Sequence, residues 1–446
     1  MVIAWKRWSL SDAIMRYVLS LFALALLALA NPAYAAADDI VVYEVKRGDT
    51  LFALGNKYFV RMADYVSVQK FNRIKHATEI PVGTKIRISR SFLKFQSSVA
   101  QIISVRGNVF HTVKGAQIVA IKGGSLGEGS MLQTTNSSFA TIVLENGSRV
   151  SLPSNSDLRI VRLRRYLIDS SLDYDFEVGR GAARSKVTPM TGRNDRYSVK
   201  TPKAVSAVRG TEFQSRYDDT AGADFSEVTE GAVSVALPDS KPEMLPAGNG
   251  LAVKSDGSVI RESLIQTGEI DFASRVQKEQ IVSFVLPSGA TGTGMRISLA
   301  TDAGFVDEFA EASAKNGVAV FEGIEDGNYF ARFRAISVNG IEGLPVTYAF
   351  KRRQNSVSAS GGKDDFGYAF KWAGEGRGKL RYRFQLFQGK VGGTAMVDEA
   401  GLEAQEISVS DLPADQYFWR VASIQFVDGE MSTNWTPFEK LIVSAP

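Results

Sequence analysis

The amino-acid sequence predicts a multidomain, mainly all-β protein with one small strand–helix–helix–strand module near its N-terminus. From about residue 100, short alternating apolar and polar runs are broken by Gly, Asn, Asp and Ser, which is typical of strands joined by tight turns. No segment with a convincing helical period interrupts them. With 446 residues, of which 44% are hydrophobic and 22% charged, the chain has the composition of a globular protein with several cores.

Residues 1–35 are predicted to be an export signal. Basic residues up to Arg16 precede an uncharged apolar run at 17–30, and a small-residue site follows at 33–35. The apolar run is shorter than the roughly 18 to 20 residues that span a bilayer as a helix. We therefore expect export with cleavage, leaving no transmembrane segment, and retention as a signal anchor is the alternative.

Residues 40–90 form the predicted strand–helix–helix–strand module. Its two ends alternate in the strand period, at Tyr43 and Val45 and again at Ile86 and Ile88. Between these ends lie two short helical patterns, one over 51–58 and one near 65–71. The side chain of Asp49 or Thr50 stands where an N-cap oxygen would meet the free amide groups of the first helix.

This module resembles the LysM family of cell-wall glycan-binding domains. The resemblance is carried by Gly48-Asp49-Thr50-Leu51 and by Pro81-x-Gly83, and it covers nearly the whole segment. It implies binding of N-acetylglucosamine-containing peptidoglycan in a shallow groove between two loops. The implied glycan-binding residues are Gly48, Asp49, Thr50, Leu51, Ile74, His76, Ile80 and Pro81. The alternative is that Thr50 only caps the helix, Leu51 and Ile80 fill the core, and His76 is a solvated loop residue.

Residues 100–258 are predicted to form an all-β domain. One hairpin is legible in detail: Ala140, Ile142 and Leu144 share a face with Val150 and Leu152, and Asn-Gly at 146–147 fits a type I′ turn. A basic cluster at 159–165 could meet acidic peptide stems or anionic lipid. The simpler interpretation of this cluster is a solvated strand face.

This domain resembles the FecR domain of transmembrane regulators, most clearly at 197–202, 208–213 and 228–233. The resemblance raises the hypothesis that the Gly210–Thr211 bond is cleaved by attack of the threonine hydroxyl. The simpler interpretation is a bulge at Gly210 followed by a strand that includes Thr211.

Two tandem sandwiches are predicted at 272–352 and 364–446, because two segments repeat. Residues 327–333 correspond to residues 415–421, and both are followed by turn residues. These units resemble fibronectin type III domains. The Ser/Gly-rich residues 358–362 are interpreted as a flexible linker between them.

Aromatic residues of the second sandwich recur at every second position, which predicts a buried sheet face rather than a sugar-binding surface. They are Phe366, Tyr368, Phe370, Trp372, Tyr382 and Phe384. Trp435 is the one ring singled out as a candidate for a surface role.

The sequence offers no catalytic set, metal site or cofactor-binding motif. It contains no Cys and two His, His76 and His111, which fall in different predicted domains. The net charge of +4 gives no case for nucleic-acid binding. We expect a non-enzymatic, periplasmic or wall-associated scaffold that holds peptidoglycan and an envelope protein partner. A FecR-like signalling component and a cell-wall enzyme of unrecognised type are the alternatives.

Overall fold

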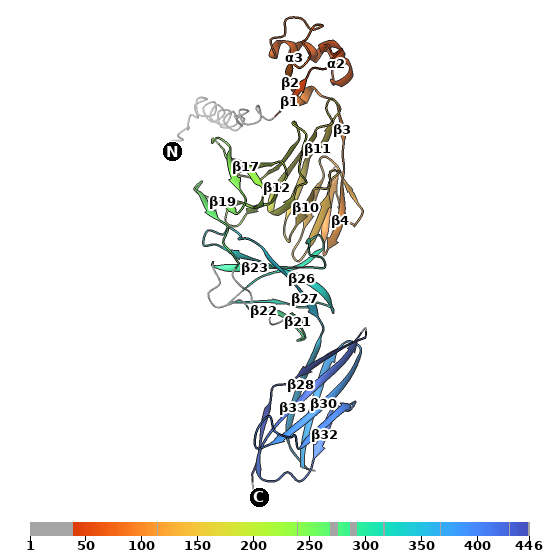
Figure 1. Cartoon of the computed structure of the whole chain (residues 1–446), viewed down its shortest axis with the longest axis vertical. Coiled ribbons are helices and arrows are strands. Elements are labelled where there is room, and N and C mark those ends of the chain that lie inside the picture. The colour runs from red at the N-terminus through yellow and green to blue at the C-terminus, as the bar shows by residue number, and fades with distance from the viewer. Residues whose placement is uncertain are drawn as a thin grey trace, which may run out of the picture. The chain divides into compact units, whose positions relative to one another are not determined.

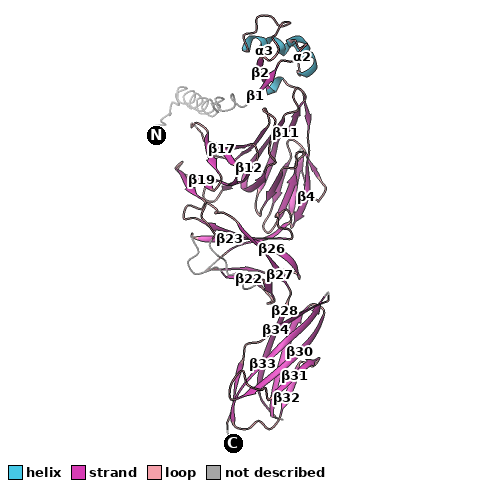
Figure 2. Ribbon diagram, viewed as in Figure 1, coloured by secondary structure: helices cyan, strands magenta, loops and turns pink. Residues whose placement is uncertain are grey.

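The computed structural model describes residues 39–113, 115–238, 240–267, 275–285, 292–314, 317–365, 367–427 and 429–444. Strands dominate these residues, and helices occur only near the N-terminal end (Figure 2). The predicted mainly-β, multidomain fold class is therefore confirmed. The predicted export signal lies outside the described residues. No helix among the described residues is both long and apolar enough to cross a bilayer.

The backbone forms two compact units, labelled by element in Figure 1. The first unit contains the chain up to Gln96 together with Arg165–Leu172 and Gly192–Asn194, and the second unit contains the rest. The elements of the first unit follow the predicted strand–helix–helix–strand order. They are β1 (Ile40–Glu44), α2 (Leu51–Tyr58), η1 (Met62–Asp64), α3 (Tyr65–Phe71), β2 (Lys85–Ser89) and η2 (Arg90–Phe92).

Local chemistry explains where α2 begins and how the two strands pair. The Thr50 hydroxyl accepts a hydrogen bond from the Ala53 amide at 3.0 Å, which caps the helix as predicted. Strands β1 and β2 are antiparallel, with Tyr43 opposite Ile86. Alternate residues of both strands therefore point into one core.

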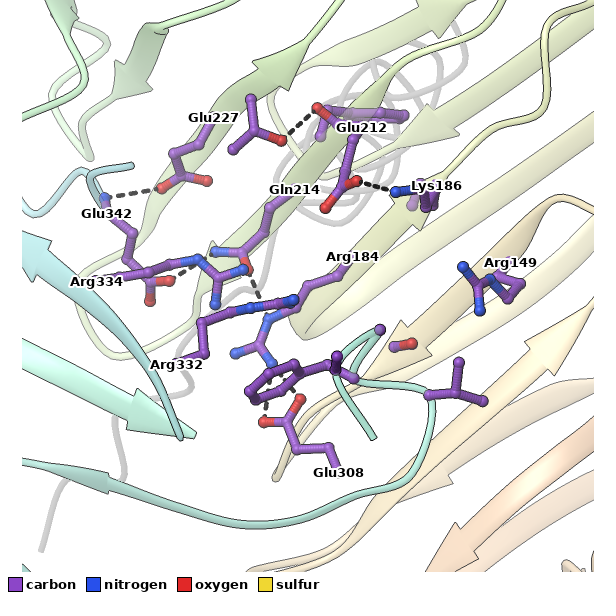
Figure 3. A pocket seen from close by; sticks show the side chains of 18 of the residues that line it. Arg149, Arg184, Lys186, Glu212, Gln214, Glu227, Glu308, Arg332, Arg334 and Glu342 are labelled. Carbon is purple, nitrogen blue, oxygen red and sulfur yellow. Dashed lines mark hydrogen bonds and ion pairs between the residues drawn. The ribbon is translucent and has the colours of Figure 1, made fainter. Parts of the chain in front are cut away.

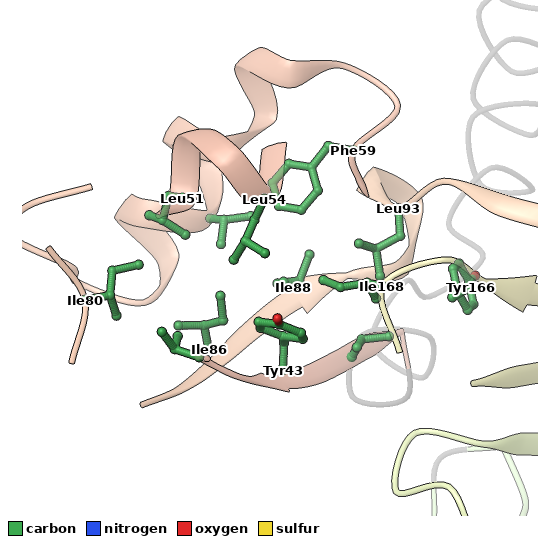
Figure 4. Packing of buried hydrophobic residues seen from close by; sticks show 13 residues of the cluster. Tyr43, Leu51, Leu54, Phe59, Ile80, Ile86, Ile88, Leu93, Tyr166 and Ile168 are labelled. Atoms are coloured by element: carbon green, nitrogen blue, oxygen red, sulfur yellow. The ribbon is translucent and has the colours of Figure 1, made fainter. Parts of the chain in front are cut away.

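The core of the first unit includes two residues from outside the predicted module at 40–90. Tyr166 and Ile168 lie in the same buried cluster as Leu54 and Ile88 (Figure 4). The Arg90 guanidinium lies 5.2 Å from the centre of the Tyr166 ring and donates to the Asn194 carbonyl at 2.6 Å. The compact unit is therefore larger than the predicted module at 40–90.

The Asn194 side chain also fastens strand β1. Its Oδ1 accepts from the Val42 amide at 3.0 Å, and its Nδ2 donates to the Val42 carbonyl at 3.1 Å. The same Nδ2 donates to the Asp169 carboxylate at 2.7 Å. One amide side chain thus satisfies the outward backbone groups of β1, as a neighbouring strand would.

The second unit begins with strands β3–β20, which form one hydrogen-bonded set that closes on itself. Their bounds are β3 (Phe95–Ser97), β4 (Ala100–Arg106), β5 (Val109–Val113), β6 (Ala116–Val119), β7 (Ser125–Leu126), β8 (Met131–Thr134), β9 (Phe139–Val143), β10 (Arg149–Leu152), β11 (Asp157–Tyr166), β12 (Leu172–Lys186), β13 (Arg196–Lys200), β14 (Val205–Val208), β15 (Glu212–Asp218), β16 (Ala223–Glu230), β17 (Ala232–Ala236), β18 (Glu243–Pro246), β19 (Asn249–Val253) and β20 (Val259–Ser263). Three segments of this set belong to the first unit: Phe95–Gln96 of β3, Arg165–Tyr166 of β11 and Leu172 of β12.

The predicted hairpin is present as β9 and β10, with Ile142 opposite Val150, but its predicted turn type is wrong. A type I′ turn needs positive φ at both central residues. Gly147 has φ 85°, whereas Asn146 is not among the residues with positive φ. Leu144 pairs with Ser148 and accepts from the Gly147 amide, so the loop has three residues and requires only one left-handed position.

The basic cluster of β11 is largely neutralised by carboxylates of neighbouring segments. Arg162 pairs with Asp175 at 2.7 Å, and Arg164 pairs with Glu128 at 2.6 Å. These contacts favour a structural role for the cluster over binding of an external anion.

Two β-sandwiches follow, as predicted. The first consists of β21 (Val276–Gln277), β22 (Val282–Val285), β23 (Gly294–Ala300), β24 (Glu308–Ser313), β25 (Val318–Phe321), β26 (Gly327–Ile336) and β27 (Val346–Arg352). The second consists of β28 (Asn355–Asp364), β29 (Gly367–Gly376), β30 (Lys379–Gln388), β31 (Val397–Leu402), β32 (Glu406–Val409), β33 (Asp415–Val427), β34 (Glu430–Trp435) and β35 (Glu439–Val443). Each encloses its own buried apolar cluster between two sheets.

The interpretation of residues 358–362 as a linker is wrong, because they lie inside strand β28. A Cβ atom on Gly361 would lie 2.6 Å from the Phe370 ring and 3.0 Å from Trp419. Glycine is therefore required here by close packing against aromatic residues. The buried aromatic face itself is as predicted at Phe370, Trp372 and Phe384, whereas Phe366 lies outside the described residues.

The internal repeat is visible as the same hydrogen bond in both sandwiches. The Tyr329 hydroxyl donates to the Glu325 carbonyl at 3.0 Å, and the Tyr417 hydroxyl donates to the Pro413 carbonyl at 2.9 Å. Each tyrosine thus reaches the carbonyl four residues upstream, as in the tyrosine corner of immunoglobulin-like sandwiches.

Candidate functional site

Two loops of the first unit carry the predicted glycan-binding residues, and the fold joins them. The loop after β1 supplies Gly48 to Thr50, and the loop between α3 and β2 supplies Ile74 to Pro81. The Leu51 amide, at the start of α2, donates to the Ala77 carbonyl of the second loop at 2.8 Å. The structure therefore brings the two sequence-distant groups of residues together at one end of the β1–β2 pair.

Asp49 shapes the first loop from within. Its carboxylate accepts from the Tyr43 hydroxyl at 2.8 Å and from the Lys46 amide at 2.7 Å. Burial and the Asp49 hydrogen bond both raise the pKa of the Tyr43 phenol well above its ordinary value. The phenol therefore stays protonated and donating, which holds the loop in one conformation.

The eight predicted residues differ in how much of each side chain can meet a ligand. Leu51 and Ile80 lie in the core, next to one another in Figure 4, at 0% and 8% exposure. Ile74 packs partly against the same cluster. Gly48, His76 and Pro81 are exposed.

Unused backbone donors remain at both loops. The amides of Gly48 and Ile80 make no hydrogen bond to any described part of the chain. An N-acetyl group offers a carbonyl acceptor, an N–H donor and a methyl group, so it suits a surface of backbone amides beside small apolar side chains. A neutral sugar requires no ionised side chain for this.

The second loop carries exposed titratable side chains. His76 and Glu79 are exposed loop residues, and the Glu79 amide donates to the His76 carbonyl at 3.3 Å. No group of three His, Asp or Glu side chains suited to a metal ion occurs within the described ranges. The loops also carry exposed charged side chains, at Arg47, Lys75 and Glu79.

Sequence reasoning missed two exposed aromatic rings, those of Phe52 and Phe71, in the helices of the first unit. Phe52 is 52% exposed, and its ring centre lies 6.0 Å from that of Tyr65. Phe71 is also exposed, at 58%, beneath the Arg87 guanidinium. The sequence could have indicated the exposure of Phe52, because this residue follows Leu51 directly and so falls outside the apolar stripe of α2.

The Gly210–Thr211 bond lies in a crowded segment. Gly210 has φ 130°, and a Cβ atom there would lie 2.8 Å from the Pro189 backbone. Strand β15 begins after Thr211, and the register shift falls between Glu212 and Phe213. The extra residue at this shift is Thr229 of β16, so no bulge forms at Gly210 in this register, and cleavage of the bond stays a prediction.

Comparison with known families matches two segments of the chain. The LysM domain family matches residues 43–89, and the FecR protein family matches residues 130–234. No curated protein matches the chain.

Several solved structures share strand arrangements with parts of the chain. A candidate anti-sigma factor from Parabacteroides distasonis is 19% identical over 30% of this chain and 59% of its own length, with a TM-score of 0.26. The first three fibronectin type III domains of chicken CNTN1 are 12% identical over 55% of this chain and 95% of theirs, with a TM-score of 0.20. A two-domain fibronectin type III segment of chicken tenascin is 15% identical over 36% and 93%, with a TM-score of 0.18.

LysM is a glycan-binding family and FecR a regulatory one, and both are typical of extracytoplasmic proteins. Residues 43–89 of the chain therefore match the LysM domain family and residues 130–234 match the FecR protein family, and two β-sandwiches follow these segments.

Proposed function

We propose that this protein is a non-enzymatic, peptidoglycan-binding scaffold of the bacterial cell envelope. The observation that carries the proposal is the pair of loops joined by the Leu51–Ala77 hydrogen bond, which lies within the segment matching LysM. The loops present the unpaired amides of Gly48 and Ile80 beside the exposed side chains of His76 and Pro81.

In this proposal, Leu51 and Ile80 act through position rather than through side-chain contact. Their side chains support the loops from the core, and Thr50 keeps the N-terminus of α2 in place. N-acetylglucosamine units would lie across the two loops, pairing with backbone amides and covering Pro81. The β-domain and the sandwiches would present surfaces to an envelope protein partner, and the mature chain would be periplasmic or wall-associated.

Co-sedimentation with purified peptidoglycan tests the proposal on the intact exported chain. The test variant is His76→Glu combined with Pro81→Glu, because both side chains are exposed and their replacement leaves the core intact. The control is Ala63→Glu combined with Ser67→Glu, which adds the same charge at exposed positions of η1 and α3.

We expect the wild type and the control to pellet with peptidoglycan and the loop variant to stay in the supernatant. Equal pelleting of all three proteins would place wall binding outside the loops. Release of dye-labelled fragments from the pelleted wall would contradict the non-enzymatic part of the proposal.

A second candidate function is favoured by the FecR match at 130–234. In that function, the FecR domain reports an envelope event to a membrane partner. Crosslinking of the full-length protein in cells distinguishes the two, because a specific membrane-protein adduct through the FecR domain would favour signalling.

A further inference from the structure

The second unit contains a cavity of about 200 Å³ between two polar sheet faces (Figure 3). One wall comes from β10, β12, β15 and β16 of the FecR-like region. Cross-strand register there aligns Ser151 with Arg184 and Arg184 with Gln214. The other wall comes from the first sandwich, through Glu308 of β24 and Arg332 and Arg334 of β26.

Each carboxylate that lines the cavity has a cationic partner. Arg184 pairs with Glu308 at 2.6 Å, and its Nε donates to the Gln214 side chain at 2.9 Å. The remaining pairs are Lys186–Glu212 at 2.8 Å, Arg216–Glu227 at 3.2 Å and Arg296–Glu342 at 2.6 Å. The negative charge of the cavity is therefore already matched.

Three lining arginines have no such partner. Arg149, Arg332 and Arg334 make no ion pair with any carboxylate in the described part of the chain. The Arg332 guanidinium stacks 3.8 Å from the centre of the Phe305 ring, and its Nε donates to the Thr347 hydroxyl at 3.3 Å. Arg334 is only 8% exposed and makes no hydrogen bond to the described residues.

An uncompensated guanidinium that is withdrawn from water is costly. Burial lowers the pKa of Arg332 to about 9, and the neighbouring charges of Arg334 and Arg184 act in the same direction. Burial likewise lowers the pKa of Arg334, with Arg184 adding to the effect. The cavity thus holds more positive charge than its own carboxylates compensate.

We propose that this cavity, the arginine pocket, binds a small oxyanion, that is, a molecule bearing one carboxylate or phosphate group. The planar guanidinium groups of Arg332 and Arg334 can each donate two parallel hydrogen bonds to such a group, and Arg149 approaches from β10. The volume suits an anion of a few heavy atoms. This site is separate from the LysM loops and takes a different ligand class.

Binding in the arginine pocket would also stabilise the junction between the FecR-like region and the first sandwich. Arg149 belongs to the former and Arg332 and Arg334 to the latter, so the anion would contact both. A ligand that binds only the folded state raises the free energy of unfolding according to its concentration.

The test uses inorganic phosphate as the probe, on the full chain, with chloride adjusted to keep ionic strength constant. Calorimetric titration should show one saturable site, and phosphate should raise the unfolding temperature. Arg334→Met should weaken binding about tenfold or more, because it removes a bidentate donor pair. Arg420→Met is the control, since Arg420 occupies in the second sandwich the strand position equivalent to that of Arg332 and does not line the cavity, so this variant should leave binding unchanged.

Arg332→Met provides a second test should Arg334→Met fold poorly, because the Arg332 side chain lies at the edge of the buried network. Acetate in place of phosphate distinguishes a carboxylate ligand from a phosphate ligand. The proposal is overturned if neither anion binds saturably to the wild type. It is equally overturned if Arg332→Met and Arg334→Met bind as tightly as Arg420→Met.

Discussion

The two sandwiches place an arginine at the same point of the same repeat, yet in different surroundings. Arg332 follows Tyr329 by three residues, and Arg420 follows Tyr417 by three. Arg332 stacks on Phe305 and faces the arginine pocket. Arg420 lies 4.0 Å from the centre of the Trp435 ring and donates to a glutamine of the neighbouring strand.

The next residue on the same strand face separates the two modules further. It is Arg334 in the first sandwich and Ala422 in the second. In the first sandwich, the sheet face that another domain covers carries both Arg332 and Arg334. At the equivalent positions of the second sandwich, Arg420 stacks on an aromatic ring and Ala422 is uncharged. The surroundings of Arg332 and Arg334 therefore result from burial by a neighbouring domain, and not from their position in the repeat.

The largest expected difference concerns paired charges. Arg184→Met would leave the Glu308 carboxylate, whose side chain is 5% exposed, without its partner. We expect a loss of about 3–5 kcal/mol in the free energy of unfolding. The control is Arg383→Met in the second sandwich, where the Arg383–Asp398 pair is 40% and 35% exposed. That variant should lose about 0–1 kcal/mol. Urea denaturation measures both, and equal losses would contradict the comparison.

A glycine lies in the turn that follows the repeated strand in each sandwich, and the two glycines differ in how closely they are packed. Gly340 and Gly429 have φ 86° and 79°, so alanine is strained at both positions. A Cβ atom on Gly340 would also lie 3.2 Å from the Phe225 ring, whereas nothing lies within 4 Å of one on Gly429. We expect Gly340→Ala to cost about 2–3 kcal/mol and Gly429→Ala about 1–2 kcal/mol. Thermal unfolding of both variants would contradict this account if Gly429→Ala were the more destabilised.

An acid-dependent effect is expected where the first sandwich meets strand β4. Hydrogen bonds from Arg106 outweigh burial and lower the pKa of Asp307 to about 2. Because the folded-state pKa lies below the unfolded one, the stabilisation is present above about pH 4 and is lost as pH falls toward 2. Asp307→Asn should cost about 1–2 kcal/mol at neutral pH.

The stability gap between wild type and Asp307→Asn should close between about pH 4 and pH 2. Asp398→Asn in the second sandwich is the matched control, since Arg383 also lowers the pKa of Asp398 but the Asp398 side chain is more exposed than that of Asp307. Unfolding curves over this pH range measure the effect. A difference in the free energy of unfolding between wild type and Asp307→Asn that stays constant with pH would contradict the role given to the Arg106–Asp307 contact.

The smallest expected effect concerns the two tyrosine corners. Tyr417→Phe and Tyr329→Phe each remove one hydrogen bond to a backbone carbonyl. We expect about 1 kcal/mol for Tyr417, whose ring is fully buried, and less for Tyr329. Reversal of this order in denaturant titrations would show that the two corners do not share one structural role.

Much of the fold follows from local patterns. The spacing of Leu51, Leu54 and Tyr58 gives the buried stripe of α2, and alternation gives the aromatic face of β29 and β30. The loops proposed to bind glycan could be located because their motifs are contiguous. The exposure of the loop residues could not be predicted. From sequence alone, Leu51 and Ile80 could lie either in the core or on the surface.

The remaining features depend on contacts between distant segments. Tyr166 ends an ordinary alternating strand in the sequence, and nothing local indicates that it enters the core of the LysM unit. Arg332 and Arg334 likewise alternate as on any solvent-facing strand. Only the covering sheet, with Arg184 and Gln214, turns that face into a cavity.

Binding of N-acetylated glycan by the loops of the LysM unit can be measured with a soluble, uncharged ligand. We would titrate the intact exported chain with a tetramer of N-acetylglucosamine by calorimetry, beside the His76→Glu, Pro81→Glu variant and the Ala63→Glu, Ser67→Glu control. We expect saturable binding by the wild type and the control. The affinity of the loop variant should be at least tenfold lower. Absence of binding by the wild type, or equal affinity in all three proteins, would contradict glycan binding by these loops.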